Sequence, residues 1–225
     1  MHCHTDHSPD CFMKPAVLAR AARKAGLDAI FVTDHERLGG FEALRDVGGE
    51  LHVFPGQEIR TSRGEIIGLF VSEAVSPGLP PEEALKRLRE QGALAYLPHP
   101  FARLVPSRLK REAVERLASR FDVVEVANSR NVLRADDRRA GDFAARHGLL
   151  RGGGSDAHWP WDLGRAYVEL PPFDSPETLK ASLATARVVD RAKSSYLLSA
   201  FNAAIYPFRE AWWNLIGDRR ALRRL

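Results

Sequence analysis

Short apolar runs alternate with amphipathic segments through most of the chain, and this alternation limits the folds open to it. The runs 27–32, 65–71 and 93–97 are almost continuously apolar, as is typical of strands buried on both faces. Amphipathic segments follow them, several opened by proline or ended by glycine, which is typical of helices. We expect strands over residues 27–32, 51–54, 65–71, 93–97, 121–126, 149–150 and 167–170, and helices over residues 14–25, 39–47, 80–90, 111–120, 135–147 and 176–186. Such a repeat predicts an α/β fold with parallel strands, in which site residues gather at the carboxyl ends of the strands.

The composition agrees with a globular enzyme. The chain has 225 residues, of which 44% are hydrophobic and 28% charged. No apolar run approaches the roughly 20 residues that span a bilayer, and no signal-peptide pattern opens the chain, so we expect a cytoplasmic protein without a membrane partner. The two cysteines, Cys3 and Cys11, are too few for a disulfide framework and are expected to be reduced.

The positive charge of the chain lies mainly at its C-terminus. Four arginines and one aspartate within residues 217–225 supply +3 of the formal net charge of +4, so residues 1–216 are close to neutral. A near-neutral body weakens a nucleic-acid-binding interpretation. We expect one barrel domain over residues 1–195 and an aromatic and basic extension over residues 196–225, which packs on the domain or on a second subunit in preference to a membrane surface.

Residues of metal-ligand type stand where the expected strands end. In an extended segment His2 and His4 point to the same side, and Asp10 follows after a Ser-Pro turn. If these histidines end a first strand, most of that strand would precede Met1, so the chain is expected to begin part-way into it. The candidates after later strands are His35, Glu58, His99, Asp156 and His158, with Glu65 set apart from them. Each has an ordinary structural explanation alone, but a chance placement of all of them at strand ends is improbable.

This set of residues points to a cluster of metal ions. Neutral imidazole and carboxylate groups without thiolate clusters suit Mn²⁺, Zn²⁺ or Fe better than Ca²⁺ or a structural zinc. The candidates exceed what one ion with roughly four to six ligands can use, so we expect two or three divalent ions. Water bound to such ions ionises near neutral pH, which favours hydrolysis by a metal-activated hydroxide.

The motifs and their order resemble those of the PHP family, named for polymerase and histidinol phosphatase. They are His2-x-His4, Ser8-Pro9-Asp10, Thr33-Asp34-His35, Gly56-Gln57-Glu58, His99-Pro100 and Ser155-Asp156-Ala157-His158. The resemblance implies a distorted (β/α)7 TIM-like barrel with a phosphoesterase site at the carboxyl ends of its strands. It also implies one ion held by His2, His4, Glu58 and Asp156, a second held by Asp10, His35 and His158, and a third held by Glu58 and His99.

One position departs from the family pattern. Many members have a histidine in the segment after the bridging glutamate, and the matching position here is Glu65. Glutamate can ligate a third ion and shifts the preference of that site toward harder ions such as Mn²⁺. The alternative is an exposed turn carboxylate.

Several residues near the motifs could serve the site in other ways. Asp34 could orient a ligand imidazole or cap a helix, and Arg130 and Arg103 could clamp a substrate phosphate or lie on the surface. Trp159 and Trp161 could line the site, stack on a nucleobase of a substrate or pack in the core. The histidines expected not to be ligands are His7, His52 and His147.

The sequence leaves three functions open. The first is hydrolysis of a small phosphomonoester, such as a nucleotide or a metabolite resembling histidinol phosphate, by an enzyme that can form a homo-oligomer. The second is a phosphodiesterase or exonuclease on short oligonucleotides, which calls for a basic groove that a near-neutral body does not favour. The third is a non-catalytic metal-binding module. We expect the first, because the set of ligand residues is nearly complete.

Overall fold

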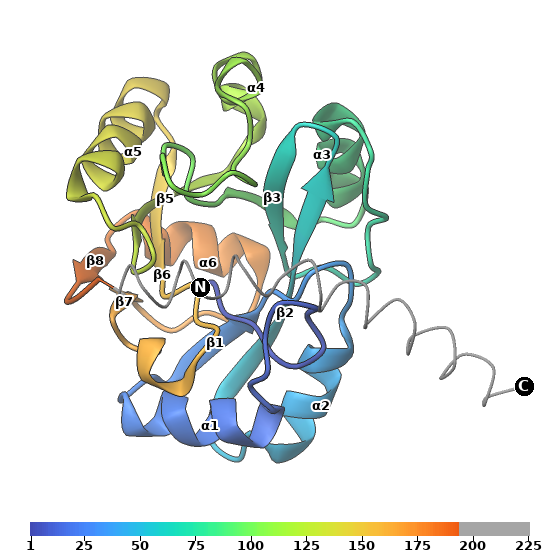
Figure 1. Cartoon of the computed structure of the whole chain (residues 1–225), viewed down its shortest axis with the longest axis vertical. Helices are drawn as coiled ribbons and strands as arrows, with labels where there is room; N and C mark the ends of the chain where they lie inside the picture. The colour runs from blue at the N-terminus through green and yellow to red at the C-terminus, as the bar shows by residue number, and fades with distance from the viewer. Residues whose placement is uncertain (194–225) are drawn as a thin grey trace, which may run out of the picture.

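One curled sheet forms the centre of the molecule. The computed structural model describes residues 1–193, so the expected extension over 196–225 lies outside the described residues. Six strands pair in the order β1-β2-β3-β4-β5-β6 (Figure 1). They are β1 (Ala29–Val32), β2 (His52–Thr61), β3 (Gly64–Leu69), β4 (Leu94–Leu97), β5 (Val123–Asn128) and β6 (Leu150–Gly154). The α/β class is therefore as the sequence predicts.

The pairing of β3 differs from the expected parallel arrangement. The pairs β1–β2, β4–β5 and β5–β6 are parallel, but β3 is antiparallel to both β2 and β4. Residues 62–63 alone link β2 to β3, whereas a parallel pair needs a crossover of roughly a dozen residues or more. The expectation of a complete (β/α)7 barrel is not confirmed, because the described strands form a curled half-barrel (Figure 1).

A second, two-stranded sheet follows the first. In it β7 (Ala166–Glu169) pairs antiparallel with β8 (Arg187–Asp190), and α6 (Pro176–Leu183) lies between them in the chain. The serine before α6, Ser175, forms a capping box with Thr178, which satisfies two backbone groups at the start of the helix. The sequence does not predict β8, because four residues with charged ends carry no periodic signal.

Helices α1 to α5 lie around the outside of the sheet (Figure 1). Their bounds are α1 (Pro15–Lys24), α2 (Gly39–Val47), α3 (Pro81–Glu90), α4 (Arg111–Arg116) and α5 (Arg134–His147). These agree with the expected helices to within a few residues, except that the expected helix 111–120 divides into α4 and a 3-10 helix (Ala118–Arg120). Among residues 1–193, no helix is long and apolar enough to cross a bilayer.

Side chains alternate between the two faces of each strand, and both faces are buried. In β1, Ile30 and Val32 pack outward with side chains of α1 and α2, whereas Phe31 turns inward. Inside the curl, Phe31 packs with Leu179 and Leu183 of α6 and with residues near the starts of β5 and β6. Burial of an apolar side chain of this size stabilises the fold by about 1.5–3 kcal/mol. The apolar interior fills one end of the half-barrel and leaves the carboxyl ends of the parallel strands to polar groups.

Residues 1–4 join the two outer strands of the sheet at their carboxyl ends. On the β6 side the hydrogen bonds are Met1 N–H to Gly153 O (3.2 Å), Asp156 N–H to His2 O (2.9 Å) and His4 N–H to Ala157 O (3.1 Å). On the β1 side they are Cys3 N–H to Thr33 Oγ1 (3.2 Å) and Thr33 N–H to Cys3 O (2.9 Å). This segment therefore spans the gap between β1 and β6, and it carries two of the candidate ligands.

Candidate metal centre

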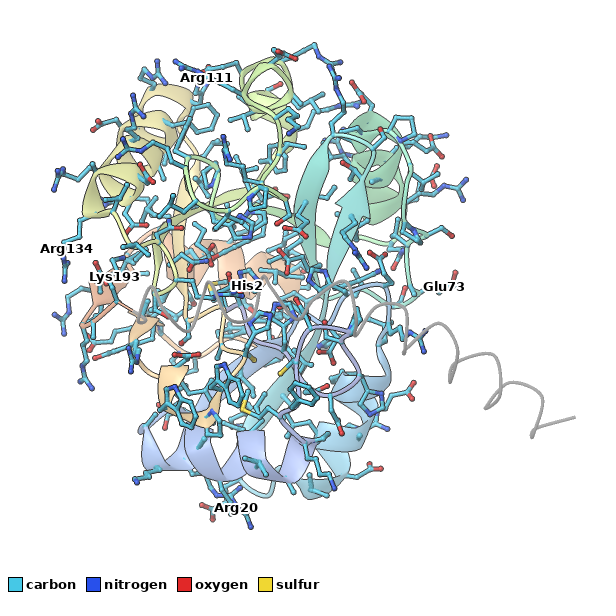
Figure 2. All side chains as sticks on the ribbon, in the orientation of Figure 1. His2, Arg20, Glu73, Arg111, Arg134 and Lys193 are labelled. Carbon is cyan, nitrogen blue, oxygen red and sulfur yellow. The ribbon has the colours of Figure 1, made fainter. Side chains whose placement is uncertain are left out.

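The structure brings all nine candidate ligands together at the end of the sheet where the parallel strands terminate. Figure 2 shows His2 at the centre of the molecule, far from charged residues at the periphery such as Arg20 and Arg111. The candidates come from the N-terminal segment (His2, His4), the loop before α1 (Asp10), the end of β1 (His35), β2 (Glu58), the start of β3 (Glu65), the end of β4 (His99) and the segment after β6 (Asp156, His158). Asp10 is half-buried and the other eight are buried.

Glu58 lies between the histidines. Its Oε2 is 3.1 Å from His2 Nε2 and 3.2 Å from His4 Nε2, whereas its Oε1 is 3.2 Å from His99 Nε2. Its Oε2 is also 3.6 Å from His35 Nε2. One carboxylate therefore offers its two oxygens to different groups of imidazoles, which is the arrangement expected of a bridging ligand.

The candidate residues form four overlapping groups that could each hold an ion. Within a group, one ligand atom from each residue lies within 4.8 Å of the others. The groups are His2, His4 and Glu58; His2, His99 and Asp156; His4, Asp10 and His158; and Glu58, Glu65 and His99. In addition, His35 Nε2 lies 3.2 Å from Asp10 Oδ2, so His35 adjoins the third group.

The chemistry of the donor atoms fits divalent cations. The Nε2 atoms of His2 and His4 face each other at 3.1 Å, so two neutral imidazoles cannot both present a proton there. A cation between them and the carboxylates accepts both nitrogen lone pairs and offsets the charge of Glu58 and Asp156. Imidazole and carboxylate donors without thiolate are suited to Mn²⁺, Zn²⁺ or Fe.

The outer ring nitrogens of three histidines have protein partners that leave Nε2 facing the cluster. His2 Nδ1 lies 3.2 Å from Glu125 Oε1, His158 Nδ1 lies 2.9 Å from the Asp156 carbonyl, and His4 Nδ1 lies 3.4 Å from Ser8 Oγ. Such contacts fix ring orientation and raise the basicity of a metal ligand. No role for Glu125 or Ser8 is predicted from the sequence, although a glutamate inside the expected strand 121–126 is a signal for such a role.

Opposite charges hold the cluster together when no ion is bound. Burial alone would lower the pKa of His35, but the negative charges of Asp10 and Glu58 outweigh it and raise that pKa to about 10. Burial would also lower the pKa of His4, but hydrogen bonds that its ring donates to Asp156 and Glu58 outweigh burial and raise that pKa to about 9. Burial would raise the pKa of Glu58, but the charges of His2 and His35 hold it well below its usual range.

Glu65 is a buried member of the cluster and not an exposed turn carboxylate. Because β3 runs antiparallel, its first residues lie at the same edge as the last residues of its neighbours. Glu65 Oε2 is 3.9 Å from His99 Nε2, and its side chain is 6% exposed. Burial and the nearby charge of Glu58 raise the pKa of Glu65, which is the effect that a shared cation would reverse.

The two arginines considered as phosphate clamps have different positions. Arg130 Nη1 lies 3.4 Å from Asp156 Oδ1 and 3.0 Å from His158 Nδ1, so its guanidinium borders the cluster, and its side chain is 20% exposed. Arg103 instead pairs with Asp136 at 2.9 Å, away from the candidate ligands. Arg103 is therefore not placed to contact a substrate at the cluster.

Asp34 supports the N-terminal segment and does not contact an imidazole. Its two carboxylate oxygens accept hydrogen bonds from the Thr5 backbone N–H and hydroxyl, each at 2.6 Å. The expectation that it orients a ligand imidazole directly is wrong, because the chain after His4 turns its backbone toward this carboxylate.

The remaining candidates lie outside the four groups. Trp159 and Trp161 stack on each other with centroids 5.2 Å apart and planes at 6°, and Trp161 is 52% exposed. Trp161 is therefore a surface residue and Trp159 is half-buried, and neither belongs to the ligand groups. The histidines that the sequence analysis sets aside, His7, His52 and His147, also lie outside these groups.

Comparison with known proteins relates part of the sequence, and the fold, to PHP proteins. A model of PHP-associated sequences matches residues 135–188. A two-domain protein from Bacteroides vulgatus that contains a predicted PHP-like metal-dependent phosphoesterase has a similar structure, with a TM-score of 0.69 over 84% of this chain and 63% of that chain, at 20% sequence identity. The chain thus contains a PHP-associated segment and has the fold of that PHP-like protein. The resemblance seen in its motifs is thereby confirmed.

Two further relatives widen the comparison. A lesion-specific endonuclease from Pyrococcus furiosus shares this fold with a TM-score of 0.65 over 84% of this chain and 56% of that chain, at 19% identity. An uncharacterized protein of Methanocaldococcus jannaschii is 43% identical over 119 residues, which are 52% of this chain and 50% of that relative. The chain therefore matches about half the length of that relative.

Glu65→Gln tests whether the group of Glu58, Glu65 and His99 holds an ion through the Glu65 carboxylate. We expect the variant to bind one Mn²⁺ fewer per chain, because an amide oxygen is a weaker ligand than a carboxylate. Metal content after equilibrium dialysis measures the change. Glu73→Gln, at a residue exposed on the periphery (Figure 2), is the matched control, and equal metal content in both variants would return Glu65 to a structural role.

Metal binding should release protons near neutral pH. The raised pKa values of His4 (about 9) and His35 (about 10) stabilise the metal-free protein fully below pH 6.5, and this stability is lost as pH rises through 9 to 10. An ion needs neutral imidazoles, so we expect the apparent Mn²⁺ affinity to rise with pH over this range. Calorimetric titration at pH 7.5 in two buffers of different ionisation enthalpy counts the protons. A count of zero would contradict the protonated state, and His52→Gln should leave the count unchanged.

Proposed function

We propose that this chain is a metal-dependent phosphoesterase that hydrolyses a small phosphomonoester. The observation that carries the proposal is the convergence of five imidazoles and four carboxylates on one site, with Arg130 beside them. The similarity to a protein containing a PHP-like metal-dependent phosphoesterase supports it. A nucleotide or a metabolite resembling histidinol phosphate remains the proposed substrate class.

The proposed ligands are those of the four groups together with His35. His2, His4, Glu58 and Asp156 would hold one ion, Asp10, His35 and His158 a second, and Glu58, Glu65 and His99 a third. Such ions, whether Mn, Zn or Fe, polarise phosphoryl oxygens and make water a nucleophile at neutral pH. The chain supplies no serine, cysteine or histidine nucleophile in this scheme.

The residues of the chain position the substrate and keep the site rigid. Arg130 presents a planar guanidinium whose N–H groups can bind two oxygens of a phosphate, and its contact with Asp156 fixes where that phosphate would sit. Glu58 is held by imidazoles on both of its oxygens, so its orientation is set before substrate arrives. Burial of the site reduces solvent screening and strengthens each of these contacts.

A second candidate is hydrolysis of phosphodiesters in short nucleic acids. The similar fold of the lesion-specific endonuclease favours this alternative. The same ligands and Arg130 could act on a diester, but a diester carries less negative charge and needs room for two ester groups.

The decisive experiment compares p-nitrophenyl phosphate with bis-p-nitrophenyl phosphate in the presence of Mn²⁺. We expect turnover of the monoester that a chelator abolishes and that Asp156→Asn lowers by about 100-fold or more, since loss of contacts behind a ligand already costs roughly 10- to 100-fold. Asp46→Asn, at a side chain that is 74% exposed, is the matched control. Circular dichroism checks that each variant is folded.

Each other outcome changes the proposal. Turnover of the diester alone would support the phosphodiesterase. Metal binding without turnover of either ester would support a non-catalytic metal-binding module, and the absence of metal binding would overturn the site assignment.

Arg130→Lys tests the proposed phosphate contact. We expect kcat/KM to fall roughly 10- to 100-fold, because hydrogen bonds to charged groups contribute about 1.5–3 kcal/mol and a lysine cannot reproduce the planar fork. Metal content should stay unchanged. Arg103→Lys, whose arginine pairs with Asp136 away from the candidate ligands, should leave kcat/KM within about twofold. Equal effects of the two variants would remove Arg130 from the site.

A further inference from the structure

A glutamate that belongs to none of the four ligand groups lies directly beneath them. Glu125 is in the middle of β5 and is fully buried. Its neighbours Val124 and Val126 face the outer helices, so Glu125 faces the inside of the half-barrel, as Val123 does. The pairing of β5 with β6 shifts register between Glu125 and Ala127, and such a bulge re-aims side chains. An ionisable group placed between an apolar core and a cluster of ligands calls for an explanation.

Four donors surround the Glu125 carboxylate. Oε1 lies 3.2 Å from His2 Nδ1 and 3.0 Å from the Tyr96 hydroxyl. Oε2 accepts from the His99 backbone N–H at 2.9 Å and from Asn128 Nδ2 at 2.8 Å. The Asn128 amide cannot be turned over without loss, because its Oδ1 accepts the Arg130 backbone N–H at 2.8 Å. With a donor on each side of both oxygens, the carboxylate acts as an acceptor throughout.

This arrangement determines which nitrogen of His2 carries the proton. An acceptor at Nδ1 requires Nδ1–H, so in the neutral ring that a metal ion needs, Nε2 has the free lone pair. Nε2 is the atom that faces His4 and Glu58 at 3.1 Å. The same carboxylate also accepts a hydrogen bond from the backbone N–H of His99. It contacts a third candidate ligand indirectly, because Asn128 Nδ2, which donates to Glu125, also lies 3.3 Å from Asp156 Oδ2.

The neighbouring strand leaves room for this pair. A Cβ on Gly154 would lie 2.5 Å from His2 Cβ and 2.7 Å from Glu125 Oε1, both too close for ordinary contacts. A side chain at Gly154 would therefore displace one of the two partners. The His2 ring is therefore held in place by three features, which are Gly154 in β6, the bulge in β5 and the Glu125 carboxylate.

We infer that Glu125 is a positioning residue that fixes the Nδ1–H tautomer of His2 and so prepares its Nε2 to bind a metal ion. The inference rests on the proposed metal-dependent function, because it assigns a role to Glu125 within that site. Glu125 contacts no substrate or ion in this role and acts through His2.

Glu125→Gln separates this role from packing. The side chain keeps its shape, but one of its two polar atoms becomes an NH₂ donor. The amide oxygen must face the His99 N–H and Asn128 Nδ2, because neither of these can become an acceptor there without other losses. The NH₂ group then faces the Tyr96 hydroxyl and His2 Nδ1. The Tyr96 hydroxyl can rotate and accept a hydrogen bond. The His2 ring can accept only by losing the proton on Nδ1, so its proton moves to Nε2. We expect Zn²⁺ and Mn²⁺ affinity to fall roughly 10- to 100-fold, as is usual when a partner behind a metal ligand is lost.

Tyr96→Phe is the matched control, because it removes one donor to the same Oε1 and leaves the His2 tautomer unchanged. The full-length wild type and both variants are titrated with Zn²⁺ against a competing chelator, and thermal unfolding in chelator measures their stability without metal. Ring-nitrogen NMR of ¹⁵N-histidine-labelled, Zn²⁺-loaded wild type then identifies the protonated nitrogen of His2. We expect Nδ1–H in the wild type, weakened binding in Glu125→Gln and wild-type affinity in Tyr96→Phe.

The outcomes distinguish this inference from the proposed function. If wild type binds no metal, the proposed function fails and the inference fails with it. If wild type binds metal and Glu125→Gln binds it equally well, or if both variants weaken binding equally, the inference alone is overturned. If Glu125→Gln does not fold, the wild-type spectrum decides, since a proton on His2 Nε2 with Nδ1 unprotonated would overturn the assigned tautomer.

Discussion

Attraction between buried imidazoles and buried carboxylates is the interaction on which the rest of this structure depends. An isolated charge loses several kcal/mol of solvation when it is buried, so a carboxylate such as Glu58 is tolerated here only because cations or donors meet it on every side. The raised pKa of His35 and the lowered pKa of Glu58 express the same attraction. A divalent cation in the site would take the place of the protons that now balance these charges.

The sequence predicts the strand–helix repeat well because apolar periodicity reflects burial. The helix expected over 39–47 matches α2, and the run 121–126 matches most of β5. The direction of β3 is not predicted by periodicity, since an apolar run buried on both faces has the same pattern whether its neighbours are parallel or antiparallel. The two-residue link 62–63 that decides the direction appears only in the structure, because β2 extends beyond the strand expected over 51–54 to Thr61.

The candidate site is predicted in part, and the division has a physical reason. Residues such as His99 and Asp156 stand out because polar groups after apolar strands are unusual, and the structure places them together. Groups that act from behind the ligands do not stand out in this way: Glu125 lies inside a strand, and its role depends on what faces it across the sheet. Arg103 and Arg130 have equivalent positions after strands, so tertiary contacts alone distinguish the one paired with Asp136 from the one at the cluster.

The position of segment 1–4 couples the binding of a metal ion to the closure of the sheet. The same few residues bridge β1 to β6 through backbone hydrogen bonds and present His2 and His4 to the cluster. Closing the gap between the edge strands and assembling the ligands are therefore one conformational event. An ion that binds the assembled ligands stabilises the closed sheet in proportion to the logarithm of its free concentration, so cellular metal supply and the folding equilibrium of this chain become thermodynamically linked.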